Sequence, residues 1–424
     1  MGQITALIDG NNFYAACEQS IDPAIAGHPV VVLSNNDGCV IARSTEARGL
    51  GISMGVPYFK IQHKLKRLGI IVRSSNYSLY GDMSQRLMSL LEKYCDNLEI
   101  YSIDEAFARL SRPINNDLCF WARHLRSLAY QNLGITISIG IGHNKLQAKL
   151  ANNLAKTIDT KVGIFDLLNP NNYGEQLEKI SIEEVWGIGC KMAHCLRTKG
   201  VNTAKQLRDM PSNELKSQYG VVGLRLQNEL RGEICFPFRE QLTPKKETCV
   251  SRSFSKPVTS IQELRQAIAT YVVMASEKLR KQGQKAGTIK VFARTNLYHE
   301  NPYNKSATTN LETASNNTTD LLAASLPLTE QIFENNKAII KAGVIMQNLE
   351  TTEYLQGHLF SKFREKEQKK RENLIVTVDQ INNRYGNGSI NWAICGTNQR
   401  WKMRRVSIGR YSTTQIKNIP IVKA

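Results

Sequence analysis

The sequence predicts an α/β chain built from several domains. In its first 155 residues, strand-like and helix-like segments alternate in the order strand, helix, strand, strand, helix, strand, which favours a mixed core over a bundle or a sandwich. At 424 residues the chain is too long for one compact core. Short helical stretches follow Pro170 and strand-like segments return at 247–350, so the predicted class is α/β and multidomain.

The N-terminal elements are predicted from apolar runs and from the turn-forming residues that separate them. An apolar strand at 4–8 ends in the polar turn Asp9-Gly10-Asn11-Asn12, and a helical segment at 13–20 comes next. A strand at 29–33 precedes short helices, broken by glycines and Pro57, at 45–68. The remaining predictions are a helix at 80–95, strands at 98–103 and 106–110, a helix at 118–132, a strand at 136–141 and a helix at 145–155.

The pattern of expected secondary structure changes twice in the C-terminal half. Glycine-punctuated short helices run to about residue 231, and the Pro- and Lys-containing stretch 236–246 marks a boundary. Beyond it we expect strands around a helix at 261–282, with the Asn- and Thr-rich stretch 301–319 forming a long loop. The most basic part begins at 351, and its charge run 362–371 is typical of a solvated helix face.

Composition excludes several classes of protein. No apolar run approaches the roughly 18 residues of a membrane span, and no signal peptide is visible, so we expect a soluble protein without a membrane partner. The nine cysteines include no CxxC pair, which favours reduced thiols in the cytoplasm over zinc or a disulfide framework.

The charge is strongly basic and uneven. Lys and Arg number 55 against 37 Asp and Glu, a net charge of +18. Residues 351–424 hold 14 basic against 5 acidic residues, whereas residues 1–180 hold 18 against 16. This imbalance favours a polyanionic partner such as nucleic acid, and a basic surface kept for solubility is the alternative.

Three carboxylates mark a candidate catalytic site. Asp9 ends an apolar strand, and Asp104-Glu105 lie between two strands, where the chain changes direction and adjacent side chains can converge. Three such carboxylates could hold two Mg²⁺ ions for phosphoryl transfer, since Mg²⁺ prefers a few carboxylates plus substrate phosphates. The alternative is that Asp9 caps a turn and the acidic pair is a solvated hairpin tip.

Longer motifs surround these acids. The stretches at 9–15 (Asp-Gly-Asn-Asn-Phe-Tyr-Ala), 31–43 (with Asn-Asn-Asp-Gly-Cys-Val-Ile-Ala-Arg) and 101–107 (Tyr-Ser-Ile-Asp-Glu-Ala-Phe) resemble the Y-family DNA polymerases, and within them the UmuC branch. The resemblance covers essentially the whole chain. It implies a right-hand polymerase with a ferredoxin-like palm at 1–30 and 75–165, small fingers at 31–74, a helix–hairpin–helix thumb at 166–238, an α/β little-finger DNA-gripping domain at 245–350 and a basic C-terminal extension at 351–424.

The resemblance also implies roles for single residues. Asp9, Asp104 and Glu105 match the metal-binding carboxylates, with the Gly10 carbonyl as a further ligand. Phe13 and Tyr14 match the pair beneath the incoming sugar, and Tyr14 falls on the steric gate that leaves no room for a 2′-hydroxyl. Arg48 and Lys156 match contacts to the triphosphate. Thr45 departs from the pattern, because some relatives carry a tyrosine there.

Further segments are candidate DNA and protein contacts. Gly187 and Gly189 lie in a turn that resembles a helix–hairpin–helix, whose backbone can approach a phosphate; the alternative is a plain helix connection. Two strands are expected to present basic and aromatic side chains on one face, namely Arg252, Phe254 and Lys256 on the first and Lys290, Phe292 and Arg294 on the second; the alternative is an ordinary amphipathic sheet. Gln356, Leu359 and Phe360 resemble the bacterial clamp-binding peptide, and a loop folded back on the chain is the alternative.

Together these observations predict a template-directed DNA polymerase that copies damaged DNA by Mg²⁺-dependent nucleotidyl transfer. The resemblance implies primer-template DNA and deoxynucleoside triphosphates as substrates, error-prone synthesis in the SOS response, and a processed UmuD-like dimer, a RecA filament and the sliding clamp as partners. Two alternatives are a non-catalytic DNA-binding subunit of a repair complex, which would lack a carboxylate or the gate, and a nucleotidyl cyclase, which would need no grip on duplex DNA.

Overall fold

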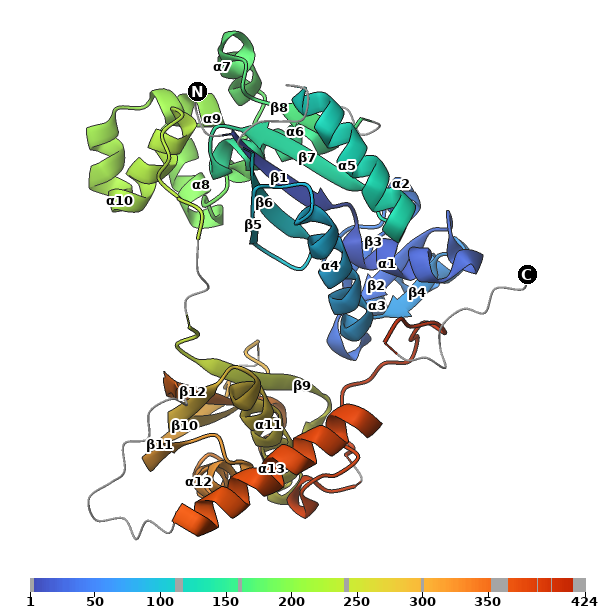
Figure 1. Ribbon diagram of the computed structural model, residues 1–424, viewed down its shortest axis with the longest axis vertical. Coiled ribbons are helices and arrows are strands. Elements are labelled where there is room, and N and C mark those ends of the chain that lie inside the picture. The colour runs from blue at the N-terminus through green and yellow to red at the C-terminus, as the bar shows by residue number, and fades with distance from the viewer. Residues whose placement is uncertain are drawn as a thin grey trace. The chain divides into compact units, whose positions relative to one another are not determined.

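The structure is a computed structural model that describes residues 4–110, 117–158, 162–239, 244–298, 301–351, 365–386, 388–397 and 399–414 (Figure 1). The chain forms two compact units. Unit 1 comprises residues 1–241 together with 406–424, and unit 2 comprises residues 242–405. The chain therefore passes from one unit to the other twice, and each unit is described by itself.

Unit 1 is centred on a five-stranded sheet with the order β5-β6-β1-β7-β8. The central strand β1 runs antiparallel to both β6 and β7, and β8 joins β7 in parallel. The predicted strands are confirmed, although the strand expected at 98–103 is shorter. The strands are β1 (Ile4–Gly10), β5 (Asn97–Ile100), β6 (Glu105–Leu110), β7 (Ile137–Gly142) and β8 (Ile164–Asp166).

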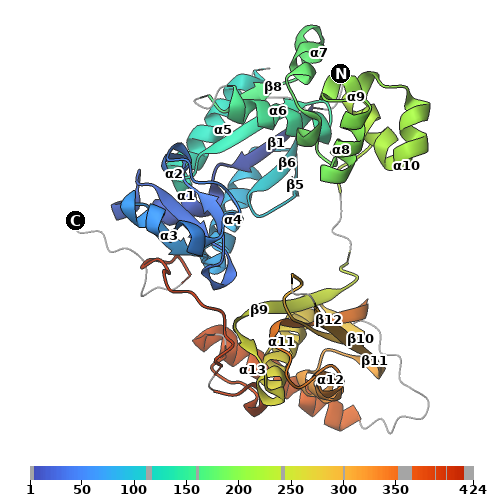
Figure 2. The same cartoon turned by 180° about the vertical axis from the view of Figure 1, so that it is seen from behind.

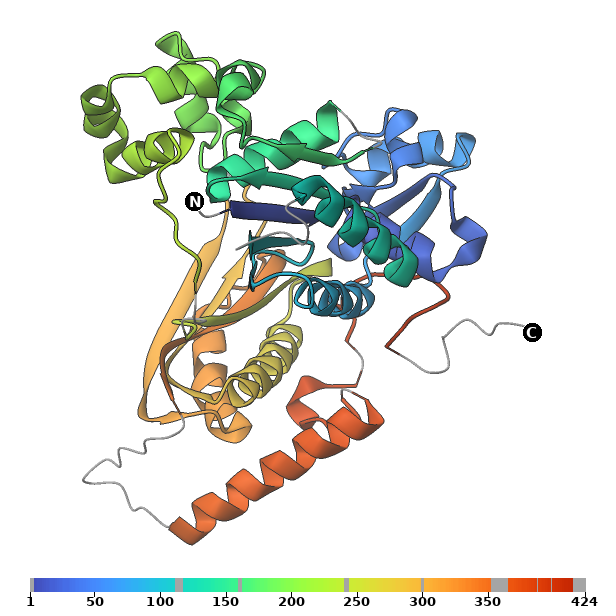
Figure 3. The same ribbon diagram turned by 45° about the horizontal axis from the view of Figure 1, so that its top comes forward.

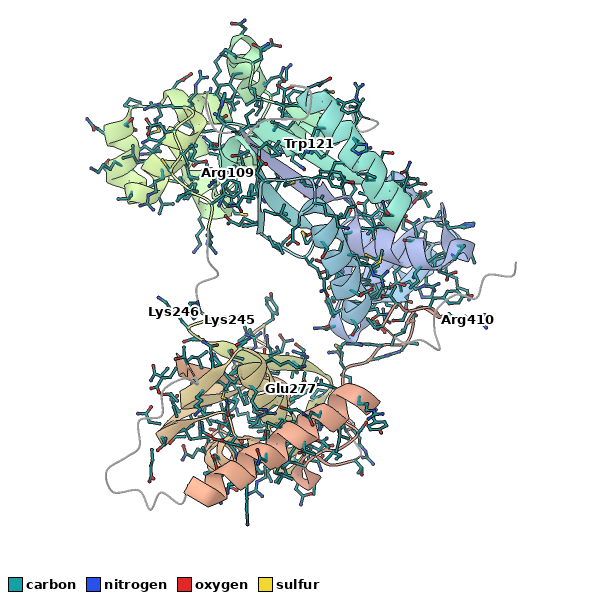
Figure 4. The ribbon with its side chains drawn as sticks, viewed as in Figure 1. Arg109, Trp121, Lys245, Lys246, Glu277 and Arg410 are labelled. Carbon is teal, nitrogen blue, oxygen red and sulfur yellow. The ribbon has the colours of Figure 1, made fainter. Side chains whose placement is uncertain are left out.

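Helices cover both faces of this sheet, because β1 is apolar on both sides. Ala6 and Ile8 pack in the core with α1 (Phe13–Ile21), α4 (Tyr77–Leu91) and α5 (Leu118–Leu133). Trp121 of α5 is buried there, and its indole N–H donates to the Tyr94 carbonyl at 3.0 Å (Figure 4). Leu7 points to the opposite face, where α6 (Lys145–Thr157) lies along the sheet (Figure 3).

A glycine allows α6 to lie unusually close to the sheet. A Cβ built on Gly140 of β7 would come within 2.1 Å of the Asn152 backbone nitrogen in α6. The Asn152 side chain uses this proximity to donate to the carbonyls of Leu7 at 3.4 Å and Ser138 at 3.0 Å. The helix is thus bonded directly to the sheet at the end where the predicted acidic residues lie.

A three-stranded sheet, in the order β3-β2-β4, forms a second part of unit 1. The predicted strand at 29–33 is confirmed as β2 (Val30–Leu33), which pairs antiparallel with β3 (Val40–Arg43) and parallel with β4 (Ile71–Ser74). Its small core includes Val31, Leu33 and Leu65. The helices here are α2 (Thr45–Gly49) and α3 (Tyr58–Arg67), as the glycine-punctuated pattern predicts.

The third part of unit 1 is helical. Its apolar core joins residues from all of its helices to the outer stripe of α6. Thr203 closes a capping box with Gln206, which fixes the start of one helix. The helices are α7 (Pro170–Glu178), α8 (Cys190–Thr198), α9 (Ala204–Asp209) and α10 (Ser212–Leu230).

Unit 2 has a four-stranded antiparallel sheet in the order β11-β10-β12-β9, with α11 and α12 packed on one face (Figure 2). The long loop predicted at 301–319 is wrong, because 304–315 is an edge strand. Its alternating Thr and Asn side chains are polar since its outer face is solvated. The elements are β9 (Thr248–Val258), α11 (Ile261–Lys281), β10 (Gln284–Arg294), β11 (Asn304–Ser315), α12 (Thr318–Gln331) and β12 (Ile339–Thr351).

The C-terminal extension adds α13 (Glu365–Tyr385) to unit 2. Arg280 of α11 and Asp379 of α13 form a bidentate ion pair, with nitrogen–oxygen distances of 2.6 and 2.8 Å. Beyond α13, Cys395 and Trp401 are buried in the core of unit 2. All nine cysteines are free thiols. Within the described ranges, no helix has the length and apolar character needed to span a bilayer.

Candidate active site

Two of the predicted carboxylates face each other across neighbouring strands. Asp9 at the end of β1 and Glu105 at the start of β6 are partners in the antiparallel register, so their side chains lie on the same face of the sheet. That face is the one covered by α6. The Asp9 side chain is almost fully buried, with 7% of the residue exposed.

Asp104 joins this pair through a tight turn between β5 and β6. Its carbonyl accepts the Gly10 N–H at 2.8 Å, which holds the two chain segments together. The Ser102 hydroxyl donates to the Asp104 carboxylate at 2.6 Å and accepts the Glu105 N–H at 3.0 Å. The acidic pair therefore lies at a hairpin tip, where the chain reverses direction beside the end of β1.

Two lysines of α6 reach the carboxylates. Lys156 Nζ lies 2.6 Å from Asp9 Oδ2, and Lys149 Nζ lies 2.9 Å from Glu105 Oε2. Lys149 was not among the residues predicted for the site. Its spacing of seven from Lys156, two helical turns, places both on one face of the helix and is the signal that could have identified it.

The ionisation of the acidic pair is unequal. Burial raises the pKa of Asp9 to about 7; Lys156 counteracts this effect, and the neighbouring Glu105 reinforces it. Burial also acts to raise the pKa of Glu105, but its hydrogen bond with Asp9 and its ion pair with Lys149 outweigh burial and leave that pKa lowered. Glu105 therefore carries its negative charge over a wider pH range than Asp9 does. Above neutral pH both carboxylates are ionised and would bind a cation more favourably than a proton.

The donor set fits a hard divalent cation. Asp9, Asp104 and Glu105 offer only oxygen atoms, which are the ligands that Mg²⁺ prefers. In the described part of the chain, no three Asp, Glu, His or Cys side chains are gathered into a ready-made cage for a metal. Mg²⁺ commonly keeps waters and takes substrate phosphates as ligands, so a few carboxylates suffice.

An aromatic cluster stands directly after the acidic strand end. Phe13 is buried, and a Cβ on Gly10 would lie 2.9 Å from its ring, so this position requires glycine. Tyr14 is half-buried; its ring stacks on Tyr80 with centroids 4.5 Å apart and meets Tyr77 edge-on at 6.0 Å. Tyr14 is thus held as a rigid ring at the start of α1.

The predicted triphosphate contacts lie on different elements. Arg48 is exposed on α2, whereas Lys156 lies on α6 and forms an ion pair with Asp9. Helix α2 lies next to the start of α1, because the Asn12 side chain donates to the Thr45 hydroxyl at 3.1 Å. Thr45 therefore has a hydrogen-bond partner inside the protein.

The turn with Gly187 and Gly189 joins a short 3₁₀ turn to a helix, and does not join two regular helices as the resemblance to a helix–hairpin–helix predicts. It is preceded by a single 3₁₀ turn at Ile182–Glu184 and followed by α8. Gly187 has a φ of 94°, and a Cβ there would meet Leu226 at 3.0 Å. Gly189 is exposed, with open space around it, so the N-terminus of α8 is accessible to a phosphate.

Trp186, in the same turn, fastens the helical part to the five-stranded sheet. Its indole N–H donates to the Tyr101 hydroxyl at 3.1 Å, and its ring meets Phe107 and Phe236 at centroid distances of 6.0 and 5.6 Å. Lys149 lies over both the Tyr101 and Trp186 rings, at 4.6 and 5.8 Å. The turn is therefore coupled to the acidic site through Lys149.

The open face of the sheet in unit 2 confirms one predicted strand pattern. On β10, Ile289, Val291 and Ala293 are buried, whereas Lys290, Phe292 and Arg294 alternate with them and are partly exposed. The side chains paired with them on the two neighbouring strands are Asn304, Ser306 and Thr308 on β11 and Lys341, Gly343 and Ile345 on β12. This face is therefore polar and basic.

The pattern predicted for β9 is wrong. Arg252 pairs with the buried Ala342, on the side covered by the helices. Phe254, two residues further on, lies on the same face by regular alternation; it is buried, and its ring meets Trp401 at a centroid distance of 6.1 Å. Lys256 is exposed. Regular alternation could not reveal this, because the core partner Trp401 lies far along the chain.

The predicted clamp-binding segment with Gln356, Leu359 and Phe360 lies outside the described residues.

Comparison with known proteins matches this geometry to a family. The chain matches the profile of the impB/mucB/samB family over residues 8–153 and that of its C-terminal domain over 245–359. Protein UmuC of Salmonella typhimurium is 37% identical over 422 residues, 99% of this chain and 100% of that protein. The chain belongs to the impB/mucB/samB family. It is a member of the UmuC branch of the Y-family DNA polymerases, as the sequence motifs predict.

Other relatives of this family member agree. Protein ImpB of Salmonella typhimurium is 35% identical over 99% of both chains, and DNA polymerase IV of Oceanobacillus iheyensis is 28% identical over 90% of both. A solved Y-family DNA polymerase chimera shares the fold, with a TM-score of 0.66 at 21% identity over 81% of this chain and 98% of that one. Residues 372–422 match a domain of unknown function.

Proposed function

We propose that this chain is a DNA-directed DNA polymerase that performs error-prone translesion synthesis in the SOS response. The observation that carries the proposal is the cross-strand pair Asp9 and Glu105. Asp104 lies in the adjoining hairpin turn, and the Tyr14 ring lies at the start of α1, directly after β1. A protein that only bound DNA would gain nothing from the buried Asp9 carboxylate beside Glu105, since ionised Asp9 costs folding free energy.

The parts of the fold take the roles of a right hand in this proposal. The five-stranded sheet within 1–30 and 75–165 is the palm, and the three-stranded sheet within 31–74 forms the fingers. The helical part within 166–238 is the thumb, and the four-stranded sheet within 245–350 is the little finger. Residues 351–424 form the basic extension.

Asp9, Asp104 and Glu105, with the Gly10 carbonyl, would hold two Mg²⁺ ions. Bound there, these ions would supply charge stabilisation for the primer oxygen and the triphosphate during nucleotidyl transfer. Lys149 would keep Glu105 ionised and oriented through its 2.9 Å contact. Arg48 and Lys156 would neutralise the phosphates as pyrophosphate leaves.

Selection of the sugar would depend on Tyr14. Its ring is fixed by the Tyr80 stack and the Tyr77 edge contact, so it cannot swing aside without losing both. A rigid ring beneath the sugar excludes a 2′-hydroxyl by steric overlap. Buried Phe13 would support the backbone under Tyr14.

The open sheet face of unit 2 supports a grip on DNA that ignores sequence. Lys290, Arg294 and Lys341 provide cations, and Ser306 and Thr308 provide hydroxyl groups beside them. Cations and hydroxyls are the groups that proteins use on the DNA backbone, where they carry no base information. A polymerase that must pass damaged bases needs this kind of grip.

We further propose that a processed UmuD-like dimer, a RecA filament and the sliding clamp are partners of the chain. The similarity to Protein UmuC supports the first of these. The sequence Gln-Gly-His-Leu-Phe at 356–360 supports the clamp, with Leu359 and Phe360 as apolar anchors.

Primer extension on an abasic template tests the proposal. Asp104→Ala and Glu105→Ala should each lower Mg²⁺-dependent extension at least about 1,000-fold, on the order of 4 kcal/mol of transition-state stabilisation, while primer-template binding stays nearly unchanged. The matched control is Asp82→Ala, because Asp82 is an acid of α4 that forms an ion pair with Arg86 on the surface of that helix. Extension at the wild-type rate by either active-site variant would overturn the assignment. DNA binding without any extension by the wild type, with and without the partners, would favour the non-catalytic subunit.

A further inference from the structure

The last described residues of the chain do not belong to the unit that precedes them. Residues 365–405 lie in unit 2, but residues 406–414 are part of unit 1, where they run along the edge of the three-stranded sheet. In Figure 1 this dark red segment lies beside β4, and Figure 4 labels Arg410 within it. The domain of unknown function at 372–422 therefore contributes to both units.

The contact is made by the main chain of the segment. Ser74, the last residue of the edge strand β4, donates its N–H to the Ser407 carbonyl at 2.9 Å. The Ser407 N–H donates in turn to the Ser74 hydroxyl at 2.9 Å. This reciprocal pairing resembles the addition of a strand to an open sheet edge.

Asp37 completes the receiving site. One of its carboxylate oxygens accepts the Ser74 hydroxyl at 2.6 Å, and the other accepts the Val406 N–H at 2.9 Å. Asp37 takes a left-handed backbone conformation, with a φ of 53°, in the turn between β2 and β3. Ser74 is fully buried beneath the contact. The Asn-Asn-Asp-Gly stretch that marks the UmuC branch in the sequence thus has a structural task in this chain.

Exposure along the segment shows that it lies extended with one face on the protein. Val406, Ile408 and Arg410 are exposed, and the residues between them are partly buried. Val406 is 67% and Ile408 is 49% exposed, so these two apolar side chains contribute little to the contact. This period of two is that of a strand.

The inward positions fit closely. A Cβ on Gly409 would lie 2.7 Å from a carboxylate oxygen of Glu18. Glu18 is buried, and its other oxygen accepts the Tyr80 hydroxyl at 2.8 Å, so it has little freedom to move away. Tyr411 packs against the main core of unit 1. A side chain at 409 would therefore push the segment off its site.

The residues just before this segment are fastened to unit 2. The Ser255 N–H donates to the Trp401 carbonyl at 3.3 Å, and the buried Trp401 ring meets Tyr271 at a centroid distance of 5.8 Å. Only residues 402–405 separate this anchor from Val406. Both anchors are thus made by one short stretch of chain.

We propose that residues 372–414 are a strap that joins the DNA-gripping unit to the three-stranded sheet, and that Asp37 and Ser74 form the site on which residues 406–411 dock. The chain already connects the units at 241–242, so docking closes a second connection. Two connections restrict the motion of two DNA-contacting units, and this slows the loss of a ligand bound by both. The effect on DNA rests on the proposed function, whereas the docking site does not.

Hydrogen exchange on the full-length chain tests the docking site. Asp37→Ala removes the acceptor, and Val406→Pro removes the bonded N–H without changing any residue of the sheet. Both should make peptides within 403–414 exchange at least about 10-fold faster, roughly the loss of one hydrogen bond of about 1.4 kcal/mol. Peptides of β1 and of 390–401 should keep the wild-type rate in Val406→Pro, and Asp82→Ala should change nothing.

Two exchange results would overturn the docking site. One is wild-type protection of 403–414 in the Val406→Pro chain. The other is a wild-type segment that exchanges as fast as an unstructured peptide. If Asp37→Ala also exposes β1, that variant has lost its fold and Val406→Pro alone decides.

Dissociation from labelled primer-template DNA tests the strap. The Val406→Pro variant should dissociate from the primer-template at least about 5-fold faster than the wild type. It should retain single-nucleotide insertion, because the palm is unchanged. An unchanged dissociation rate together with faster exchange would refute the strap while leaving the docking site. A wild-type chain that binds no primer-template would refute the proposed function, and the exchange experiment would still report on docking.

Discussion

Replacing Asp9 with asparagine should stabilise the folded chain at neutral pH while abolishing DNA synthesis. Asp9 is buried, and its pKa is raised from 3.8 to about 7 chiefly by that burial. A rise of about 3 units, at about 1.4 kcal/mol per unit, means that ionised Asp9 costs the folded state up to about 4 kcal/mol. Water reaches this site beside the partly exposed Lys156 and screens part of the cost. We therefore expect Asp9→Asn to raise the free energy of unfolding by about 1–3 kcal/mol at pH 8.

The pH dependence identifies the cause of the gain. Between about pH 4 and pH 7, folded Asp9 keeps its proton and unfolded Asp9 has lost it. The wild-type free energy of unfolding therefore falls as the pH rises through this window. The asparagine side chain carries no charge at any pH, so the advantage of Asp9→Asn should be absent near pH 4, grow up to about pH 7 and then stay constant.

Urea unfolding of the full-length chain at pH 5, 6, 7 and 8 measures this difference. A hydrogen-exchange pulse at one fixed pH, read on peptides of β1 and β7, reports the unfolding of unit 1 separately from unit 2. Asp82→Asn is the control, because Asp82 lies on the surface and pairs with Arg86 on one helix. An Asp9→Asn chain that is no more stable than wild type at pH 8, or whose advantage is equal at pH 5 and pH 8, would refute the reasoning.

Three further outcomes are expected. Tyr14→Ala should raise ribonucleotide insertion about 100-fold and change deoxynucleotide insertion far less; equal rejection of ribonucleotides in single-turnover assays would place the gate elsewhere. The double change Lys290→Ala with Arg294→Ala should weaken primer-template binding and reduce the slope of log K against log salt by about 2, as titrations at several salt concentrations can show. Leu359→Ala with Phe360→Ala should abolish clamp binding in pull-down assays and retain distributive extension, and undiminished clamp binding would contradict the peptide assignment.

Local sequence was a good guide to the palm-like sheet. Its strands are short apolar runs between clear turn signals, so their order and the position of Asp9 at a strand end could be predicted. The pairing of Asp9 with Glu105, with Asp104 in the adjoining turn, agrees with the predicted change of direction between two strands, which the structure shows as the hairpin at Ser102–Glu105. These features depend on neighbours in sequence, which is why they were accessible.

The errors arose where a distant partner decides the structure. The Thr- and Asn-rich segment 304–315 reads as a loop until β10 supplies the hydrogen bonds that make it a strand. Alternation correctly groups Arg252 with Phe254, but it cannot show that this is the face covered by the helices and by the ring of Trp401. The docking of Val406 on Asp37 joins residues 369 positions apart, and no local pattern announces it.

Lys156 shows how one side chain can serve both the resting site and the reaction. Sequence similarity predicts that it contacts the triphosphate, whereas the structure places its ammonium 2.6 Å from Asp9. The two are compatible, because the buried Asp9 needs a cation nearby when it is ionised. If Mg²⁺ were held by these carboxylates, the attraction between Asp9 and Lys156 would be weaker, and the partly exposed ammonium of Lys156 would be able to contact a phosphate. Lys149, on the same face of α6 but held between Glu105 and the rings of Tyr101 and Trp186, has no such freedom and is the fixed member of the pair.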